Sequence, residues 1–391
     1  MAVISSSNTK PDLVMNNLED KKIGFLLIGG IHHIYHLIPS ATYLSAQEGL
    51  DVNIYVRTDQ EAQYCQDLLD RLGDTHTQIT TLKSQRVLHK ISPKLAVLLS
   101  HISVWKSLDA LVVAERTSTI LRRFMRSMPL FIHIPHGAGD RGKSYDKRIK
   151  HFDHVIVAGP KDKRRMIELG LTDDENCSVS GYIKPFTLEV LTKAKAKTDR
   201  KIFHNDNKII LYNPHFSEKL SSFPTCGLEM LKAFTRLTDY NFIFAPHIRL
   251  FKGAKPDLRA QYEAFSTFDN IWVDLGSENS TNMTYTLGAD IYLGDVSSQV
   301  YEFLSRPKPC IFLNPHNVSW EGDPDYAHWA LGPVCTTPEA VIAEIKISDH
   351  RHATYVEVQK NLCRQAKGEV NWNPIERAGE IIQHLVYNNR S

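Results

Sequence analysis

The chain has 391 residues, which is too long for one ordinary core and fits two domains of roughly 150 to 200 residues each. Hydrophobic residues make up 42% and charged residues 23%, which excludes a disordered or fibrous chain. The 46 basic and 44 acidic residues leave a formal charge of +2, so no general positive field exists to attract nucleic acid.

The cysteines and the N-terminal residues bear on the compartment. The six cysteines show no CxxC spacing, which favours reduced thiols over disulfides or a zinc framework. Residues 1–20 lack the apolar core of a signal peptide and are predicted to be a mobile polar tail. No apolar run approaches the roughly 20 residues that span a bilayer. We therefore expect a cytoplasmic protein.

Short apolar runs alternate with helical stretches such as Asp59–Leu72 through the first half of the chain. The runs predict strands at Ile23–Ile28, Val52–Val56, Ala110–Val113, Leu130–Ile134 and His154–Val157. Runs of this length, buried on both faces, are typical of a parallel sheet with crossover helices. We predict a Rossmann-like domain over residues 21–190.

A polar, lysine-rich stretch follows, and we predict a linker over residues 191–207. A second series of strands is expected at Lys208–Tyr212, Asn241–Ala245, Ile271–Val273, Asp290–Leu293 and Pro309–Leu313. Helix-like segments lie at Leu228–Leu237 and Ser297–Leu304. The predicted fold class is therefore α/β, with a second Rossmann-like domain over residues 208–348.

The C-terminal residues 349–391 have helical spacing. Trp372 and Pro374 mark a break between two helices in this segment. In two-domain proteins of this architecture a last helix often crosses back to the first domain, and we expect that arrangement as one possibility here.

Three histidines follow the first predicted strand in Gly29-Gly-Ile-His-His-Ile-Tyr-His36. His32 and His36 have the HxxxH spacing of some metal sites, but no acidic third ligand lies adjacent. We therefore predict no metal here and assign His32 and His33 to the binding of an acceptor substrate. A plain helix start is an equally good interpretation of this segment.

A glycine-rich turn follows a later strand in Ile134-Pro-His-Gly-Ala-Gly-Asp140. Glycine lets the backbone approach a ligand closely, so Gly137 and the nearby Arg141 are predicted to contact the acceptor. A neutral His136 imidazole at the mouth of a cleft can take the proton from an acceptor hydroxyl. The alternative is a turn with an incidental histidine.

The basic run Lys161–Arg165 lies close in sequence to Lys147 and Lys150. Such cations can meet an anionic acceptor or a membrane surface that carries a lipid-linked substrate. More often a run of this kind is the solvated face of a helix. No basic stripe is interleaved with aromatic residues, so we exclude nucleic acid as a partner.

The strongest segment for phosphate binding is Gly294-Asp-Val-Ser-Ser-Gln-Val-Tyr-Glu-Phe303, which follows a predicted strand and opens a predicted helix. Unpaired N–H groups at the helix start, with the hydroxyls of Ser297 and Ser298, can hold a phosphate without a glycine-rich loop. We assign Asp295 to the same donor site. The other interpretation is that Asp295 or Ser297 merely caps the helix.

Two further predicted strands end in histidines. Ala245-Pro-His-Ile-Arg249 places His247 and Arg249 at the carboxyl edge of the sheet, where open α/β folds bind ligands. Tyr212-Asn-Pro-His-Phe216 places His215 in the same way. Histidine and arginine can donate hydrogen bonds to phosphate oxygens, so these three residues are predicted to bind a phosphate-containing donor.

The motifs that occur in order along the chain are His136-Gly, Phe152-Asp153, Gly181-Tyr-Ile-Lys-Pro185, Tyr212-Asn-Pro, Pro246-His247, Asp295-x-Ser-Ser-x-x-x-Glu-Phe303 and Lys308-Pro309. In order and spacing they resemble the CDP-glycerol glycerophosphotransferase family of teichoic-acid synthesis, over residues 130–315. The resemblance implies the GT-B fold, in which two Rossmann-like domains face a central cleft and the second binds most of the donor.

The resemblance also implies roles for particular residues. His136 would be the general base for the acceptor hydroxyl, while His247 and the Ser297-Ser298 helix start would hold the donor phosphates. Glu302 would lie near the ribose or alcohol of the donor. The implied reaction is attack on the β-phosphorus of CDP-glycerol, which releases CMP and leaves a phosphodiester.

Several alternatives stay open. A GT-B glycosyltransferase with a nucleotide-sugar donor needs the same diphosphate site, as does a UDP-sugar 2-epimerase, and a non-catalytic binding module is the third class. The expected partners are a nucleotide-activated donor and a glycan or lipid-linked acceptor, with peripheral association at the inner face of the membrane in the second case. No cofactor is required by the motifs, and Mg²⁺ dependence stays open because only Asp295 and Glu302 stand out as carboxylates.

Overall fold

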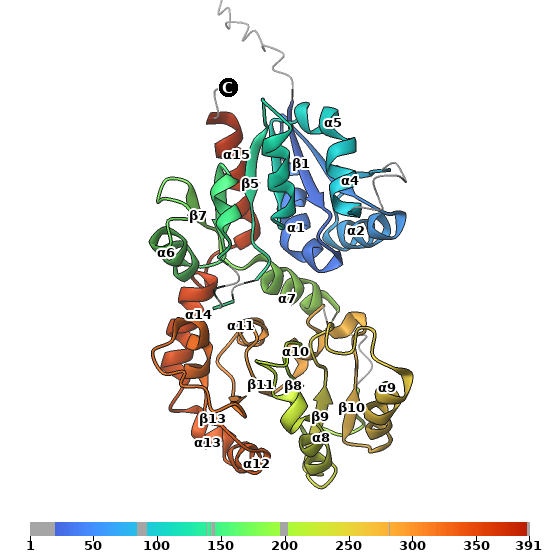
Figure 1. The fold of residues 1–391 in the computed structure, drawn as a ribbon, viewed down its shortest axis with the longest axis vertical. Coiled ribbons are helices and arrows are strands. Elements are labelled where there is room, and N and C mark those ends of the chain that lie inside the picture. Colours follow the sequence, from blue (N-terminus) through green and yellow to red (C-terminus); the bar gives the residue numbers. More distant parts are fainter. Residues whose placement is uncertain are drawn as a thin grey trace, which may run out of the picture.

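The computed structural model describes residues 20–83, 92–137, 139–140, 142, 145–195, 202–280 and 282–388. Within them the chain forms two sheets whose paired strands are parallel, one sheet in each half of the chain. Figure 1 shows the two halves following one another along the long axis of the molecule. The predicted N-terminal tail before Asp20 lies outside the described residues, and so does Arg141.

The first sheet has seven strands in the order β3-β2-β1-β4-β5-β6-β7. Its strands are β1 (Lys21–Leu27), β2 (Leu50–Val56), β3 (Gln78–Thr81), β4 (Ala110–Val113), β5 (Leu130–His133), β6 (His154–Val157) and β7 (Cys177–Val179). The strand order reverses between β1 and β4, and open α/β sheets bind ligands at the carboxyl side of such a switch point. The edge strands β3 and β7 are not predicted from the sequence, because neither contains a continuous apolar run.

Helices cover the first sheet and connect its strands. They are α1 (Ile34–Ser45), α2 (Asp59–Leu72), α4 (Pro93–Ser100), α5 (Ile102–Lys106), α6 (Pro160–Glu168) and α7 (Ile183–Lys195), with the 3₁₀ helices η1 (Ile31–His33), η2 (Thr117–Arg123) and η4 (Lys147–His151). The prediction for α2 is confirmed at both ends. The Thr58 hydroxyl accepts a hydrogen bond from the Glu61 amide at its start, and left-handed Gly73 ends it.

The second sheet has six strands in the order β10-β9-β8-β11-β12-β13, with a switch point between β8 and β11. Its strands are β8 (Lys208–Asn213), β9 (Tyr240–Phe244), β10 (Ile271–Val273), β11 (Ile291–Gly294), β12 (Cys310–Leu313) and β13 (Val334–Cys335). All except the two-residue β13 coincide with predicted strands to within one residue at each end. Both sheets therefore have the strand order of a Rossmann-like domain.

The helices of the second half are α8 (Phe223–Phe234), α9 (Pro256–Glu263), α10 (Thr284–Gly288), α11 (Gln299–Phe303), α12 (Pro338–Lys346), α13 (Ser348–His352), α14 (Val356–Lys367) and α15 (Pro374–Asn388), with the 3₁₀ helices η5 (Ala264–Thr267), η6 (Glu278–Ser280) and η7 (Pro324–Leu331). The helix predicted over Ser297–Leu304 is shorter in the structure, because Ser298 takes the N-cap position of α11. The predicted break at Trp372 and Pro374 separates α14 from α15, as expected.

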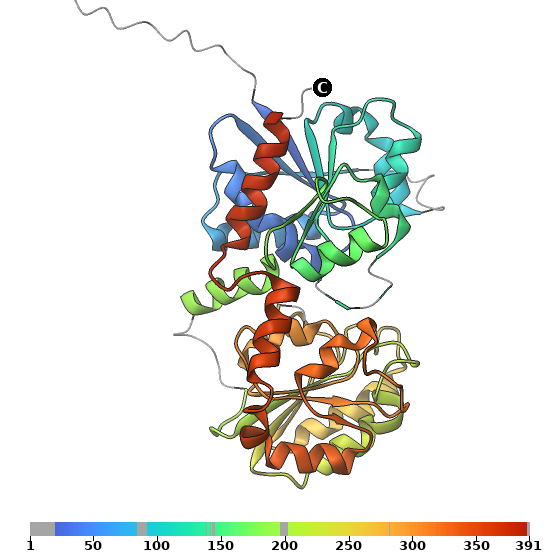
Figure 2. The same ribbon diagram turned by 90° about the vertical axis from the view of Figure 1, so that its left-hand side faces the viewer.

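The C-terminal helices connect the two halves. α14 packs against α6 of the first half and against η7 of the second. α15 then lies against α1, and Figure 2 shows it running along the upper half of the molecule. α7 extends to Lys195, inside the stretch predicted as linker 191–207, and the domain boundaries stay a prediction.

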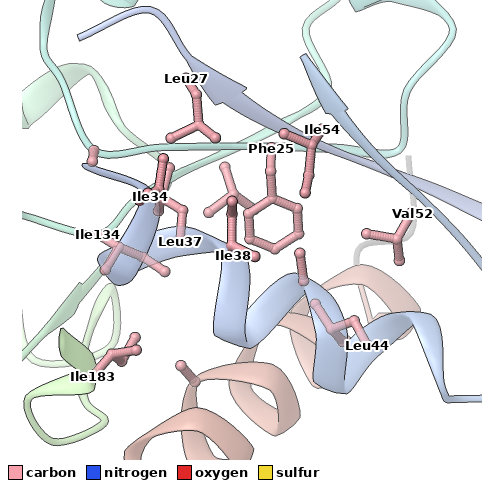
Figure 3. Close-up of a cluster of buried hydrophobic side chains, with 14 of the residues drawn as sticks. Phe25, Leu27, Ile34, Leu37, Ile38, Leu44, Val52, Ile54, Ile134 and Ile183 are labelled. Carbon is pink, nitrogen blue, oxygen red and sulfur yellow. The ribbon is translucent and has the colours of Figure 1, made fainter. Parts of the chain in front are cut away.

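One core of the first half is built around α1. In Figure 3, Phe25 and Ile54 from the sheet and Leu37, Ile38 and Leu44 from α1 point toward one another. α15 adds three residues to this cluster, and their side chains are almost fully buried: Ala378, Ile382 and Val386. The C-terminal helix therefore completes the core of the first half.

Truncating Ile382 to alanine is expected to lower the free energy of unfolding by about 2 to 5 kcal/mol, because it removes buried methyl groups and leaves a cavity. Glu380→Ala, on the exposed side of the same helix, is the matched control and should change stability by less than about 0.5 kcal/mol. Denaturant unfolding of both variants measures the difference. Equal losses of stability in the two variants would show that the packing of Ile382 against the first half does not stabilise the fold.

The cysteines and the lengths of the helices bear on two of the predictions made from the sequence. All six cysteines are free thiols, and five of them are buried. Among the described residues, no helix is long and apolar enough to cross a bilayer.

Candidate active site

The two switch points face a shared cavity of about 340 Å³ that is lined by both halves of the chain. The residues that line it are His32, His36, His136, Gly137, Tyr182, Lys184, His215, Phe216, His247, Ile248, Arg249, Ser280, Ser297, Ser298, Gln299 and Glu302. His32 follows β1 and His136 follows β5, while His215 follows β8 and Ser297 follows β11. Segments far apart in the sequence meet here because the carboxyl ends of parallel strands lie at one edge of a sheet.

His136 presents a basic nitrogen to the cavity. Its Nδ1 lies 3.3 Å from the carbonyl oxygen of Ala114, so the hydrogen-bond network assigns the proton to Nδ1 and the lone pair to Nε2. The ring is accessible to water, yet burial by the cleft walls lowers its pKa, and the charges of Arg116 and Arg249 add to the effect. His136 is therefore a neutral imidazole with Nε2 available as a proton acceptor.

Gly137 brings the first half close to the second. Its φ of +116° lies in a region that other residues rarely adopt. A Cβ built on it would lie 3.9 Å from the Ser298 hydroxyl and 3.9 Å from the Tyr182 hydroxyl. The backbone here thus passes near Ser298 of the predicted donor site.

His32 and His33 lie beside His136. The ring centroids of His32 and His136 are 5.4 Å apart, and those of His33 and His136 are 4.5 Å apart. Burial lowers the pKa of His32 to about 4 and that of His33 well below its usual value, with the neighbouring imidazoles adding to both shifts. His32 lines the cavity, whereas His33 is buried directly behind it.

His215 and His247 have the opposite tautomer to His136. The Ser217 amide donates to Nδ1 of His215 at 3.0 Å, and the Arg249 amide donates to Nδ1 of His247 at 3.2 Å. A neutral ring whose Nδ1 accepts a hydrogen bond carries its proton on Nε2. Burial, together with the Arg249 charge, lowers the pKa of His247 to about 4, so this ring is neutral. Both residues therefore offer an Nε2–H donor.

Arg249 supplies positive charge to the second half of the cavity. Its guanidinium lies 5.3 Å from the centroid of the Phe216 ring, and Phe216 in turn contacts His247 at 4.7 Å between centroids. The hydroxyl-bearing Ser297 and Ser298 line the same cavity. Arginine, neutral N–H donors and hydroxyls together form a set suited to phosphate oxygens.

Asp295 is buried beneath the cavity instead of lining it. Its carboxylate accepts hydrogen bonds from the amides of His215, Ser222 and Val296, and from the Ser222 hydroxyl. Burial raises its pKa to about 6, and these donors oppose that shift. The sequence-based assignment of Asp295 to donor contact differs from this geometry, in which the carboxylate holds the loop that carries His215.

Glu302 lines the cavity, but both of its oxygens contact the first half of the chain. The Lys184 ammonium lies 3.0 Å and 2.9 Å from the two carboxylate oxygens, and the Tyr182 hydroxyl donates to one of them at 2.9 Å. His36 stacks on Tyr182, with ring centroids 5.8 Å apart. The sequence gives no role to Tyr182 or Lys184, although both belong to the Gly181-Tyr-Ile-Lys-Pro185 motif.

A second polar network joins the halves around Asp140. Its carboxylate forms an ion pair with Lys161, accepts from the Tyr301 hydroxyl at 3.0 Å, and lies 2.9 Å from Nδ1 of His328. The other ring nitrogen of His328 lies 3.2 Å from the Asp295 carbonyl oxygen. Burial raises the pKa of Asp140, but the His328 hydrogen bond and the Lys161 charge outweigh it and lower the pKa to about 2.

Three cations of the basic run Lys161–Arg165 form ion pairs with aspartates. Besides the pair between Lys161 and Asp140, Lys163 pairs with Asp174 at 2.8 Å and Arg165 pairs with Asp325 at 2.5 Å. These cations hold α6 against its surroundings, which differs from the solvated or membrane-facing surface considered from the sequence.

The comparison with protein families gives a match over most of the chain. Residues 108–371 match the family described as CDP-Glycerol:Poly(glycerophosphate) glycerophosphotransferase. No curated protein matches the chain.

Solved structures share the fold. The wall teichoic acid polymerase TagF has a TM-score of 0.64 at 15% identity, over 94% of this chain and 88% of that chain. UDP-GlcNAc 2-epimerase from Neisseria meningitidis, bound to UDP-GlcNAc, has a TM-score of 0.65 at 14% identity, over 94% of this chain and 100% of that chain. S. aureus MnaA with UDP has a TM-score of 0.61 at 16% identity, over 94% and 96%. The predicted GT-B-like fold, with two Rossmann-like domains, is confirmed.

Proposed function

Because the chain belongs to the CDP-glycerol:poly(glycerophosphate) glycerophosphotransferase family, we propose that it transfers an alcohol phosphate, such as glycerol phosphate, from a CDP-alcohol to an acceptor hydroxyl. The observation that carries the proposal is the opposite tautomer of the histidines across the cavity. His136 offers a lone pair, while His215 and His247 each offer an N–H. One side is equipped to accept a proton and the other to bind negative charge.

The proposed reaction begins at the acceptor hydroxyl, which binds beside His136. Nε2 of His136 takes the hydroxyl proton as the oxygen attacks the β-phosphorus of the donor. A new oxygen–phosphorus bond forms, the bond from the β-phosphorus to the bridging oxygen breaks, and CMP leaves with that oxygen. The product is a phosphodiester, and the proton stays on His136 until it passes to solvent.

The second half of the cavity would hold the donor diphosphate. Arg249 is exposed in the cavity, where its charge can offset that of the phosphates. The Nε2–H groups of His215 and His247 and the hydroxyls of Ser297 and Ser298 would bind the phosphoryl oxygens. Lys184 contributes less net charge, since Glu302 forms an ion pair with it. Catalysis would come mainly from positioning and charge stabilisation.

A nucleotide-sugar glycosyltransferase is the second candidate. It is favoured by the shared fold of UDP-GlcNAc 2-epimerase bound to UDP-GlcNAc, whose TM-score of 0.65 is close to the 0.64 of TagF. The same diphosphate donors would serve such a substrate, and His136 would again take the acceptor proton. The two candidates differ in the atom attacked, which is phosphorus in one case and the anomeric carbon in the other.

Thermal unfolding with a panel of ligands tests the proposal: CMP, CDP, CDP-glycerol, UDP and UDP-sugars. A ligand at a hundred times its dissociation constant should add about 2.7 kcal/mol of stability. We expect CDP-glycerol to give the largest shift and His247→Ala to reduce it. A larger shift with a UDP-sugar would favour the glycosyltransferase, and no shift with any nucleotide would favour a binding module.

We further propose that the acceptor is a glycan or a lipid-linked molecule and that the protein works in the cytoplasm, at the inner face of the membrane when the acceptor is lipid-linked. Exposed Lys147 and Lys150 on η4 support a weak electrostatic contact with anionic lipids. Cosedimentation with anionic vesicles, lost in a Lys147→Glu, Lys150→Glu double variant, would test the membrane contact.

A further inference from the structure

Three imidazoles from two distant segments converge at the first switch point. The rings of His32, His33 and His136 form a cluster in which the ligand nitrogens all lie within 4.8 Å of one another. His32 and His33 are on η1 directly after β1, and His136 follows β5. His36, the partner suggested by the HxxxH spacing, instead stacks on Tyr182. The third member of the cluster, His136, is therefore not indicated by spacing in the sequence.

One nitrogen of the His33 ring has no hydrogen-bond partner within the part of the chain that the structure describes. Nδ1 of His33 is buried, and no hydrogen-bond partner for it is found among the described residues. The His33 side chain belongs to a residue that is only 2% exposed, so bulk water does not satisfy this nitrogen freely. A buried polar atom without a partner costs free energy, typically about 1 to 3 kcal/mol, and a bound ion is one way to recover it.

The cluster is already in the protonation state that metal ions require. Burial lowers the pKa of all three imidazoles, and the His136 ring further lowers the pKa of His32 and His33. Neutral imidazole is the form that coordinates a metal. His136 also donates from Nδ1 to the Ala114 carbonyl, the kind of outer contact that orients a metal-binding histidine.

Gly29 makes the position of His33 possible. A Cβ at residue 29 would lie 2.0 Å from Cε1 and 2.3 Å from Nδ1 of the His33 ring. The ring therefore sits directly over the backbone of Gly29, in space that any larger residue would fill. Gly29 therefore has a specific steric role in the cluster.

We propose that His32, His33 and His136 bind one divalent transition-metal ion of the zinc class, with its fourth position open to the cavity. Imidazole ligands favour zinc, copper or nickel over magnesium, and the cluster contains no carboxylate. With metal–nitrogen bonds of about 2.0 to 2.1 Å, the nitrogens would be about 3.4 Å apart, so the rings must close by roughly an ångström. Three protein ligands leave one position of a tetrahedral ion for water or another small ligand.

The ion would compete with the proposed chemistry, and this part of the inference rests on the proposed function. Nδ1 of His136 donates to Ala114, so the ion must bind at Nε2, the nitrogen assigned to accept the acceptor proton. An imidazole nitrogen bound to a metal has no lone pair left for a proton. Zinc and turnover therefore exclude each other, and the ion is an inhibitor at this site.

Cobalt(II) absorption and zinc calorimetry on chelator-treated full-length protein test the site. We expect one equivalent to bind, with the visible spectrum of a four-coordinate cobalt ion. His32→Ala and His33→Phe should each weaken binding by at least about 100-fold. His36→Phe and the exposed His151→Ala are matched controls and should leave binding unchanged. An absence of binding, or equal losses in His36→Phe and His33→Phe, would overturn the proposal.

Turnover assays separate this inference from the proposed function. With a competent donor and acceptor, zinc should reduce the rate with the same dissociation constant that calorimetry gives, and a chelator should restore it. Metal binding without any effect on the rate would refute the claim that zinc and turnover exclude each other. Metal binding in a protein that fails to turn over CDP-glycerol would leave the metal site intact and count against the proposed function alone.

Discussion

Replacing His136 with alanine is expected to lower kcat by about 10²- to 10⁴-fold, the usual contribution of a positioned general base. The reason is that the proposed function makes Nε2 of His136 the proton acceptor, in the tautomer that the contact with the Ala114 carbonyl favours. The proposed function assigns the donor to the other half of the cavity, so the thermal shift that the donor gives should be retained. Steady-state kinetics with saturating donor measure the effect.

Two further variants distinguish the loss of a base from a general effect of replacing a histidine. His151→Ala removes an exposed histidine of η4 and should leave kcat unchanged. His136→Gln can still donate to the Ala114 carbonyl but has no basic nitrogen, so it should be as slow as the alanine variant. Wild-type turnover by His136→Gln would assign this residue to structure and would require another base.

Asp140→Asn is expected to lower the free energy of unfolding at neutral pH by about 2 to 3 kcal/mol. The estimate follows from the drop in the carboxyl pKa from 3.8 to about 2, because one pKa unit corresponds to about 1.4 kcal/mol. A depressed pKa means that the stabilisation is present above the unfolded value. It is lost as the pH falls from about 4 to about 2.

Denaturant unfolding across this pH range tests the linkage. The wild type should lose stability as Asp140 is protonated, whereas Asp140→Asn should be flatter over the same interval. Asp349→Asn is the matched control, because Asp349 pairs with Lys208 on the surface with 74% of its side chain exposed. Its effect should stay below about 1 kcal/mol. If the two variants behave alike, the network around Asp140 stabilises no more than a surface pair does.

Much of the fold could be predicted from the sequence because its strands are buried on both faces. Ala110–Val113 and His154–Val157 are continuous apolar runs, and both are strands with the predicted bounds. The edge strand β3 (Gln78–Thr81) gave no such signal, since a strand paired on one side can be polar. The two-residue β13 is too short to leave any pattern.

The site was partly predictable for a related reason. Residues after strand ends, such as His136 and His215, are predictable because parallel strands bring their carboxyl ends to one edge, and in the structure they line one cavity. What each group contacts depends on tertiary structure. Nothing in the sequence indicates that Lys184 pairs with Glu302, or that His328 lies between Asp140 and the Asp295 carbonyl.

The tautomers of the histidines also cannot be predicted from the sequence. His136 donates to a carbonyl from the neighbouring strand end, whereas His247 accepts from an amide two residues later. These backbone contacts decide which nitrogen is protonated, and therefore whether a ring acts as a base or as a donor. The contact of Gly137 with the acceptor stays a prediction, and the sequence does not indicate that Ser298 lies across the cavity from it.

The return of α15 to the first sheet sets an order for synthesis on the ribosome. The core of the first half includes Ala378, Ile382 and Val386, which are translated after the whole second half. The second sheet, by contrast, is built from one continuous stretch, β8 to β13. The usual order, in which the N-terminal domain folds first during translation, should therefore be reversed. The first half must wait, with the face of α1 uncovered, for the last helix to emerge.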